Sequence, residues 1–334
     1  MTMKTSLFIK RLRETKLMLP PLTGFTDYPY RTILADFDPP FLTTEMINAR
    51  ALLQQNQRTL QMIQRVFGSH IQGVQLLGND PTSMAKAAKI IENLDFDYID
   101  INMGCTSRKV TSRGEGVSLM NDEQRAYDIV NAVFQAVNLP VTVKLRIGSS
   151  KNKITISSLS NKLVAAGAVA LTIHGRTGEK KFASPIDLPT IRDVVQQVSV
   201  PIIANGGIFT GDDAKNVLFK TGAAAVMPGR GLIGNPWILP EIRCALFGES
   251  FSFPSLQEKK KTCLKHTQEL CIHYGERRGI LHMRKILPKY FSQAQNIKEL
   301  KRDVQCIATR NDITMILGKI EERDYQWYYL ENTQ

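Results

Sequence analysis

The sequence predicts an α/β protein, a (β/α)8 TIM barrel followed by a small all-helical C-terminal domain. Short apolar runs alternate with helical patterns from Leu17 to about Arg230, which is typical of parallel strands joined by helices. Eight such runs occur, and this number favours a closed barrel over an open sheet. No GxGxxG turn follows the first run, whereas open doubly wound sheets usually carry a glycine-rich turn there.

The eight predicted strands are brief and rich in apolar or β-branched residues, as expected for strands buried on both faces. They cover residues 17–23, 41–46, 71–78, 98–104, 141–148, 170–177, 201–207 and 224–231. Between them, residues 82–94, 122–137 and 187–198 repeat apolar side chains at helical spacing. Thr82, Asp122 and Asp187 are the expected N-caps of these helices.

The composition changes after about Gly248. A polar linker, SFPS at 252–255, leads into charge-rich helical patterns over 256–279, 280–294 and 296–322. We therefore expect two domains, a catalytic barrel over residues 1–248 and a helical domain over residues 249–334.

The overall charge indicates a polyanionic partner. Lysine and arginine exceed the acidic residues by 12, and the pI is near 9.5, so nucleic acid is the natural candidate. There is no apolar run of membrane-spanning length and no signal-peptide pattern, so we expect a cytoplasmic protein without a membrane partner. The five cysteines include no CxxC pair, so we expect neither disulfides nor a metal site. We also expect a monomer.

Polar residues follow six consecutive predicted strands, where the active sites of parallel barrels lie. A single lysine or histidine at a strand end is usually structural, but six neighbouring strand ends with polar groups predict a site. These residues are Gln75, Asn102, Cys105, Lys144, Arg146, His174, Arg176, Asn205, Gly206, Gly207, Gly229 and Arg230.

The last two strand ends resemble a phosphate cradle. Gly206, Gly207 and Gly229 would let backbone N–H groups approach an anion, and Arg230 adds a bidentate donor. The alternative is that these glycines only form tight turns. If the cradle holds the phosphate of a cofactor, Lys144 would face the organic part of that cofactor. In a flavin, a cation at this place stabilises the reduced ring.

Cys105 lies in a loop rich in glycine and basic residues, MGCTSRKVTSRGEG at 103–116. The alternative is an inert thiol, which is the usual state of a lone cysteine. Because this one follows a strand end beside polar groups, we favour a catalytic role. The glycines of the loop suggest a mobile lid.

Together these motifs resemble the tRNA-dihydrouridine synthase family over about residues 17–290. The carriers are PPLTGFTDYPYR (20–31), VQLLGNDP (74–81), IDINMGC (99–105), RKV (108–110), VKLR (143–146), TIHGRT (172–177), IANGGI (203–208), GRGLIGNPW (229–237) and HMRK (282–285). The chain departs from the family pattern at Thr106, where proline is usual.

The resemblance implies FMN, with NADPH or NADH as reductant, and tRNA as the substrate, modified at uridines of the D-loop. The residues that it assigns to FMN are Pro21, Leu22, Thr23, Gln75, Lys144, His174, Asn205, Gly206, Gly207, Gly229 and Arg230. Cys105 matches the general acid of the family, and Asn102 and Arg176 would contact the uracil. Arg278, Arg284, Lys285 and Lys289 would contact phosphates of the tRNA.

Two other functions are compatible with parts of the sequence. A dihydroorotate dehydrogenase-like enzyme would share the FMN site and act on a free pyrimidine, but it has no need for a basic helical domain. A tRNA-binding chaperone would keep the basic domain but has no need for Cys105, Lys144 and the glycines.

Overall fold

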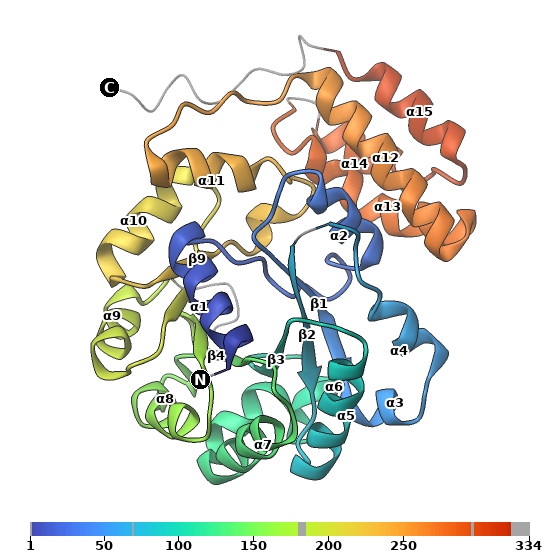
Figure 1. Cartoon of the computed structure of the whole chain (residues 1–334). Helices are drawn as coiled ribbons and strands as arrows, with labels where there is room; N and C mark the ends of the chain where they lie inside the picture. Colours follow the sequence, from blue (N-terminus) through green and yellow to red (C-terminus); the bar gives the residue numbers. More distant parts are fainter. Residues whose placement is uncertain (1, 69, 180–184, 295–296, 322–334) are drawn as a thin grey trace.

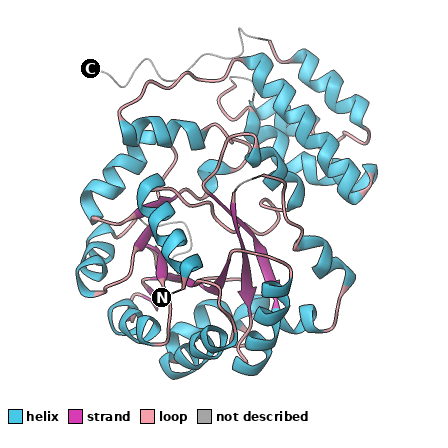
Figure 2. Ribbon diagram, in the orientation of Figure 1, coloured by secondary structure: helices cyan, strands magenta, loops and turns pink. Residues whose placement is uncertain are grey.

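The computed structural model describes residues 2–68, 70–179, 185–294 and 297–321. Seven parallel strands, in the order β1-β2-β3-β4-β7-β8-β9, curl into a barrel with helices around it (Figures 1 and 2). The strands are β1 Phe41–Asn48, β2 Ile71–Leu77, β3 Tyr98–Met103, β4 Val141–Arg146, β7 Ala170–His174, β8 Ile202–Asn205 and β9 Ala225–Met227. The predicted barrel is confirmed, and its strands match seven of the predicted runs.

The predicted first strand is the exception. Within residues 17–23, only Leu17 forms a parallel bridge, to Val226 of β9. On the other side, the Thr43 hydroxyl of β1 donates to the Leu19 carbonyl at 3.1 Å, so the segment fills the gap between the edge strands. Pro20 and Pro21 follow immediately. Because proline has no N–H to donate, the ladder cannot continue along this segment.

Helices connect the strands on the outside of the barrel. The predicted N-caps Asp122 and Asp187 are confirmed, since each carboxylate accepts a hydrogen bond from the backbone amide three residues later, at 3.0 Å. Thr82 is not a cap, because Asp80 caps that helix instead and accepts from the amide of Ser83 at 2.8 Å. The helices are α2 Tyr28–Ala35, α3 Ala49–Leu53, α4 Gln57–Met62, α5 Pro81–Asn93, α6 Arg108–Thr111, α7 Glu123–Ala136, α8 Ile156–Ala165, α9 Leu188–Gln197, α10 Gly211–Thr221 and α11 Ile238–Phe247. Short elements β5 Gly148–Ser150, β6 Lys153–Ile154, η1 Gly116–Asn121 and η2 Arg230–Leu232 lie in the loops.

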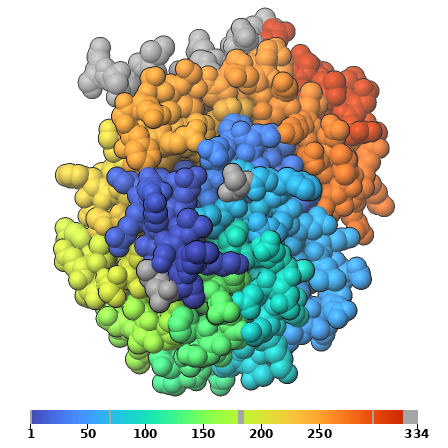
Figure 3. All heavy atoms as spheres, in the orientation of Figure 1, coloured from blue at the N-terminus to red at the C-terminus, as the bar shows by residue number. Residues whose placement is uncertain are grey.

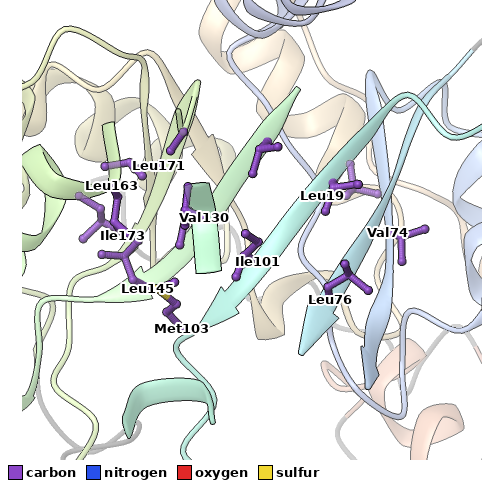
Figure 4. Packing of buried hydrophobic residues seen from close by; sticks show 14 of the residues in the cluster. Leu19, Val74, Leu76, Ile101, Met103, Val130, Leu145, Leu163, Leu171 and Ile173 are labelled. Carbon is purple, nitrogen blue, oxygen red and sulfur yellow. The ribbon is translucent and has the colours of Figure 1, made fainter. Parts of the chain in front are cut away.

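Alternation along the strands separates a hydrophobic shell from the barrel interior. Ile101, Leu145 and Ile173 belong to the core beneath the helices, together with Val130 of α7 and Leu163 of α8 (Figure 4). On each strand, the residues that alternate with these core residues point into the barrel. The interior therefore carries the polar side chains that build the site at the carboxyl ends of the strands.

The amino end of the barrel is closed by α1, Met3–Thr15. Phe8 and Leu12 of this helix pack in a cluster with Phe41 and Tyr98, the first residues of β1 and β3. The rings of Phe8 and Phe41 meet edge to face at 5.0 Å. The barrel interior is therefore filled by side chains at this end.

The C-terminal helices have a second hydrophobic cluster, with Leu270, Met283, Leu287 and Leu317 among its members. They are α12 Leu256–Tyr274, α13 Glu276–Tyr290, α14 Ile297–Asp303 and α15 Arg310–Lys319, and α12 packs against α2 of the barrel, as the orange and blue surfaces in Figure 3 show. We predicted that the first C-terminal helix ends at residue 279, but α12 and α13 are separated at Gly275, whose φ is 80°. None of the helices in the described part of the chain is long and apolar enough to cross a membrane.

Candidate active site

A cavity of about 200 Å³ opens at the carboxyl ends of the barrel strands. The strand register explains why the predicted residues meet there, because Asn102 lies beside Lys144 and His174 lies beside Asn205 in neighbouring strands. Most of the predicted site residues line this cavity: Pro21, Leu22, Thr23, Asn102, Cys105, Lys144, His174, Arg176, Asn205, Gly206, Gly207, Gly229 and Arg230.

The cavity is strongly cationic. Lys144, Arg146, Arg176 and Arg230 all contribute to its wall, and no acidic residue occurs among the described residues that line it. Burial, followed by these four charges, lowers the pKa of His174 to about 2, so its ring is neutral. Such a concentration of positive charge favours an anionic ligand.

Lys144 is held in a fixed position in the wall of the cavity. Its ammonium donates to the Asn205 side-chain oxygen at 2.9 Å, and the Asn205 amide donates to the Met227 carbonyl at 2.8 Å. Burial, followed by the charge of Arg146, lowers the pKa of Lys144 to about 8, while Asp100 below opposes the shift. The ammonium therefore stays largely protonated at neutral pH and faces the cavity with its charge.

The loop after β8 requires glycine. Gly206 and Gly207 have φ values of 116° and 70°, which other residues rarely adopt. A Cβ on Gly206 would lie 2.5 Å from Ile186 and 2.9 Å from the His174 ring. Among the described residues, no carbonyl accepts from the amides of these two glycines. Arg230 lies nearby with its guanidinium over the Phe209 ring at 5.8 Å. This combination can bind a phosphate.

Cys105 is positioned by the side chain of Asn102. The Asn102 amide oxygen accepts from the backbone N–H groups of Gly104 at 3.2 Å and Cys105 at 3.0 Å. Its amide nitrogen donates to the Gln75 side chain at 2.8 Å. Gln75 in turn donates to Asp100 at 2.6 Å. A chain of hydrogen bonds therefore runs from the barrel interior to the loop that carries the thiol.

Arg146 fixes the same loop from the other side. Its Nε donates to the Gly104 carbonyl and its Nη1 to the Thr177 carbonyl, both at 2.9 Å. The sequence placed Arg146 among the polar strand ends but assigned it no ligand, although its position two residues after Lys144 puts both on the same face of β4. Met46 and Phe209 also line the cavity, and no motif in the sequence distinguishes them.

Five predicted residues lie outside the cavity wall: Gln75, Arg278, Arg284, Lys285 and Lys289, the last of which lines a different cavity. Gln75 is buried beneath Asn102, where its side chain bonds to Asp100 and Asn102. Arg278 lines a second cavity between the barrel and the helical region. Arg284 donates from Nε and Nη2 to the Ile307 carbonyl, at 3.0 and 2.6 Å, and Lys285 is exposed on α13.

Comparison with known proteins identifies the family of this chain. Residues 18–323 match the family model described as "Dihydrouridine synthase (Dus)". A "Probable tRNA-dihydrouridine synthase" of Rickettsia conorii is 34% identical over 311 residues, covering 92% of this chain and 93% of that protein. "tRNA-dihydrouridine synthase B" of Pasteurella multocida is 35% identical over 283 residues, covering 84% and 85%. The same enzyme of Pseudomonas aeruginosa is 32% identical over 307 residues, covering 88% and 92%. The chain therefore belongs to the dihydrouridine synthase family and forms dihydrouridine in tRNA.

Proposed function

We propose that this enzyme reduces the C5–C6 double bond of D-loop uridines with FMN as its flavin and NADPH, or NADH, as the reductant. The family is flavin-dependent, and the residues of the cavity suit FMN in particular. The observation that carries the proposal is a cationic cavity whose wall includes glycines and a thiol, and to which the described residues contribute no acidic side chain.

The fit to FMN follows from the chemistry of each part of the wall. Gly206, Gly207 and Arg230 would hold the terminal phosphate with backbone amides and a guanidinium. Lys144 would lie beside the ring, where its charge stabilises the reduced form. Pro21, Leu22, Thr23, Asn205, Gly229 and His174 would complete the site.

When bound, the flavin supplies the hydride that adds to C6 of the uracil. Cys105 gives the proton that C5 needs, which completes the reduction of the double bond. The bonds from Asn102 and Arg146 hold the thiol loop in place for this step. The target uridine must leave the tRNA stack to reach the cavity, and Arg176 would contact it there.

We further propose that residues 1–248 form the catalytic domain and that residues 249–334 dock the tRNA. The separate hydrophobic cluster of the C-terminal helices supports this division. Arg278, Arg284, Lys285 and Lys289 all belong to α13, and their charges would contact the phosphates.

The test is to purify the protein, identify its bound cofactor by mass spectrometry, and incubate it with NADPH and unmodified tRNA. We expect bound FMN and dihydrouridine in the D-loop of the tRNA. If the protein binds no FMN, or reduces free pyrimidines and leaves tRNA unchanged, the proposal is wrong. The second result would favour a dihydroorotate dehydrogenase-like enzyme.

A further inference from the structure

A second cavity, of about 630 Å³, lies between the barrel mouth and helices α12 and α13. Thr23 lines both this cavity and the active-site cavity. A nucleotide that follows or precedes a uridine in the active site is therefore within reach of it. The wall combines carboxylates, cations and aromatic rings, whereas the described residues of the active-site wall include no acidic side chain.

Glu45 is the unusual residue of this wall. The register of β1 against β2 shifts between Thr43 and Met46, so Glu45 lies in a β-bulge, and bulges redirect the side chain that they carry. Only 6% of Glu45 is exposed. Its Oε1 accepts from the Gly24 amide at 2.5 Å, whereas Oε2 has no hydrogen-bond donor among the described residues.

The neighbouring carboxylate of Asp27 differs in this respect. Its Oδ1 accepts from the Tyr30 amide at 3.0 Å, and its Oδ2 accepts from the Tyr274 hydroxyl at 3.1 Å. Asp27 is therefore satisfied inside the protein, and Glu45 is not. Burial raises the pKa of Glu45 to about 7, and N–H groups of a ligand in the cavity would stabilise its ionised form. Glu45 is therefore suited to accept hydrogen bonds from such a ligand.

The other walls are suited to a nucleotide. Tyr274 and His282 stack with ring centroids 4.6 Å apart and planes 21° from parallel, and both rings line the cavity. Arg58 and Arg278 line it as well, and both are exposed. Proteins that bind unstacked RNA bases use such aromatic rings, hydrogen bonds to the Watson–Crick edge and cations near the phosphate.

We propose that this cavity binds a guanosine adjacent to the target uridine, with Glu45 accepting from the Watson–Crick edge of the base. Guanine presents N1–H and the N2 amino group side by side, which matches the two oxygens of a carboxylate. Uracil has a single N–H between two carbonyls, and those carbonyls would repel the carboxylate. The inference rests on tRNA as the substrate of this enzyme.

The test compares tRNA transcripts in which guanosines beside the target uridine are replaced by inosine, which lacks the N2 amino group. With the wild-type enzyme we expect kcat/KM to fall roughly tenfold or more, mainly through KM, because a hydrogen bond to a charged group is lost. With Glu45→Gln, which keeps an acceptor for Gly24 but lacks the second carboxylate oxygen, we expect a raised KM and no discrimination between the two transcripts. FMN content and kcat at saturating tRNA should be unchanged.

Glu241→Gln is the matched control. Glu241 accepts from the amide of Gly211 at 2.8 Å, the same kind of bond that Glu45 makes with Gly24, and it does not line this cavity. This variant should discriminate against inosine as the wild type does. Equal kcat/KM of the wild type on both transcripts would overturn the inference, and this comparison needs no variant to fold. A wild-type enzyme that formed no dihydrouridine at all would instead contradict the proposed function.

Discussion

Gln75 links the barrel interior to the loop that carries Cys105, so replacing it tests how that loop is held. Gln75→Met removes two hydrogen bonds with little change in side-chain volume. Asp100 loses its donor at 2.6 Å, and the Asn102 amide nitrogen loses its acceptor at 2.8 Å. Asp100 keeps the Thr142 hydroxyl, which donates to its other oxygen at 2.6 Å.

The cost of Gln75→Met can be worked out from these contacts. Leaving a buried polar group without a partner costs about 1–3 kcal/mol, and more for a charged group. Because Asp100 and Asn102 are both affected, we expect the free energy of unfolding to fall by about 2–5 kcal/mol. Proteins of this kind are typically stable by roughly 5–15 kcal/mol, so the variant should still fold.

The functional effect should appear in only one half of the reaction. Without its bond to Gln75, the Asn102 side chain can turn, and its oxygen then no longer holds the amides of Gly104 and Cys105. We expect reduction of the bound flavin by NADPH to continue at the wild-type rate, while its reoxidation by tRNA slows roughly tenfold or more. Stopped-flow absorbance of the flavin separates the two steps. Loss of FMN from this variant would support the direct contact with the ring that the sequence suggested.

Gln72→Met is the matched control for Gln75→Met. Gln72 lies on the same strand, is equally buried, and also makes two side-chain hydrogen bonds, to the amide and carbonyl of Val66 at 2.8 and 2.6 Å. It should lose similar stability in denaturant unfolding but keep the wild-type rate with tRNA. The reasoning is refuted if Gln75→Met loses less than about 0.5 kcal/mol or if both variants slow the reaction with tRNA equally.

Three further predictions concern single residues. Cys105→Ala should keep FMN and its reduction by NADPH but lower dihydrouridine formation by about 10²–10⁴-fold, and undiminished product by mass spectrometry would exclude it as the acid. The pKa of Lys144 is about 8, so dihydrouridine formation should fall as its charge is lost above that pH, and Lys144→Met should be slow with no such step in its pH profile. Burial lowers the pKa of His266 to about 3 from the 6.5 of an exposed ring. Between pH 6.5 and pH 3, only the unfolded chain takes up this proton. The stability that the neutral ring contributes to the fold is therefore complete above pH 6.5 and is lost as the pH falls. The free energy of unfolding of His266→Phe, compared with that of the wild type, should therefore rise by about 2 kcal/mol from pH 7 to pH 5. Denaturant unfolding at both pH values measures it, and the same difference between the two proteins at both would contradict the assignment.

Local patterns allowed most of the fold to be predicted. The apolar stripe of 122–137 and its cap Asp122 depend on neighbours within one helical turn, and the structure has α7 at Glu123–Ala136. The segment 17–23 has the same apolar character as the strands, but it can pair as a strand only if the residues after Leu17 have backbone N–H groups to donate. Pro20 and Pro21 provide none, so a single bridge forms where the sequence predicted a strand.

The cavity residues were predictable for a different reason. In a parallel barrel, every strand end is brought to the same face, so residues such as Lys144 and His174 could be grouped without knowing any distance. Glu45 is the next-to-last residue of the predicted strand 41–46; in the structure it lies in the bulge of β1 and lines the cavity beside the helical region. A bulge is set by pairing with β2, so the sequence of β1 alone does not predict the direction of this side chain.

Alternation within the barrel explains why the polar residues form a connected network rather than separate pairs. Asp100 and Asn102 are two residues apart on β3, so both point inward, and Gln75 of β2 lies beside Asp100 in the register. Each of the three side chains can satisfy its neighbours only if the other two keep their orientation. A reversed Asn102 amide would present N–H groups to the amides of Gly104 and Cys105, which cannot accept them. The carboxylate of Asp100, as a pure acceptor when ionised, thus fixes the orientation of both amides and with it the position of the thiol loop.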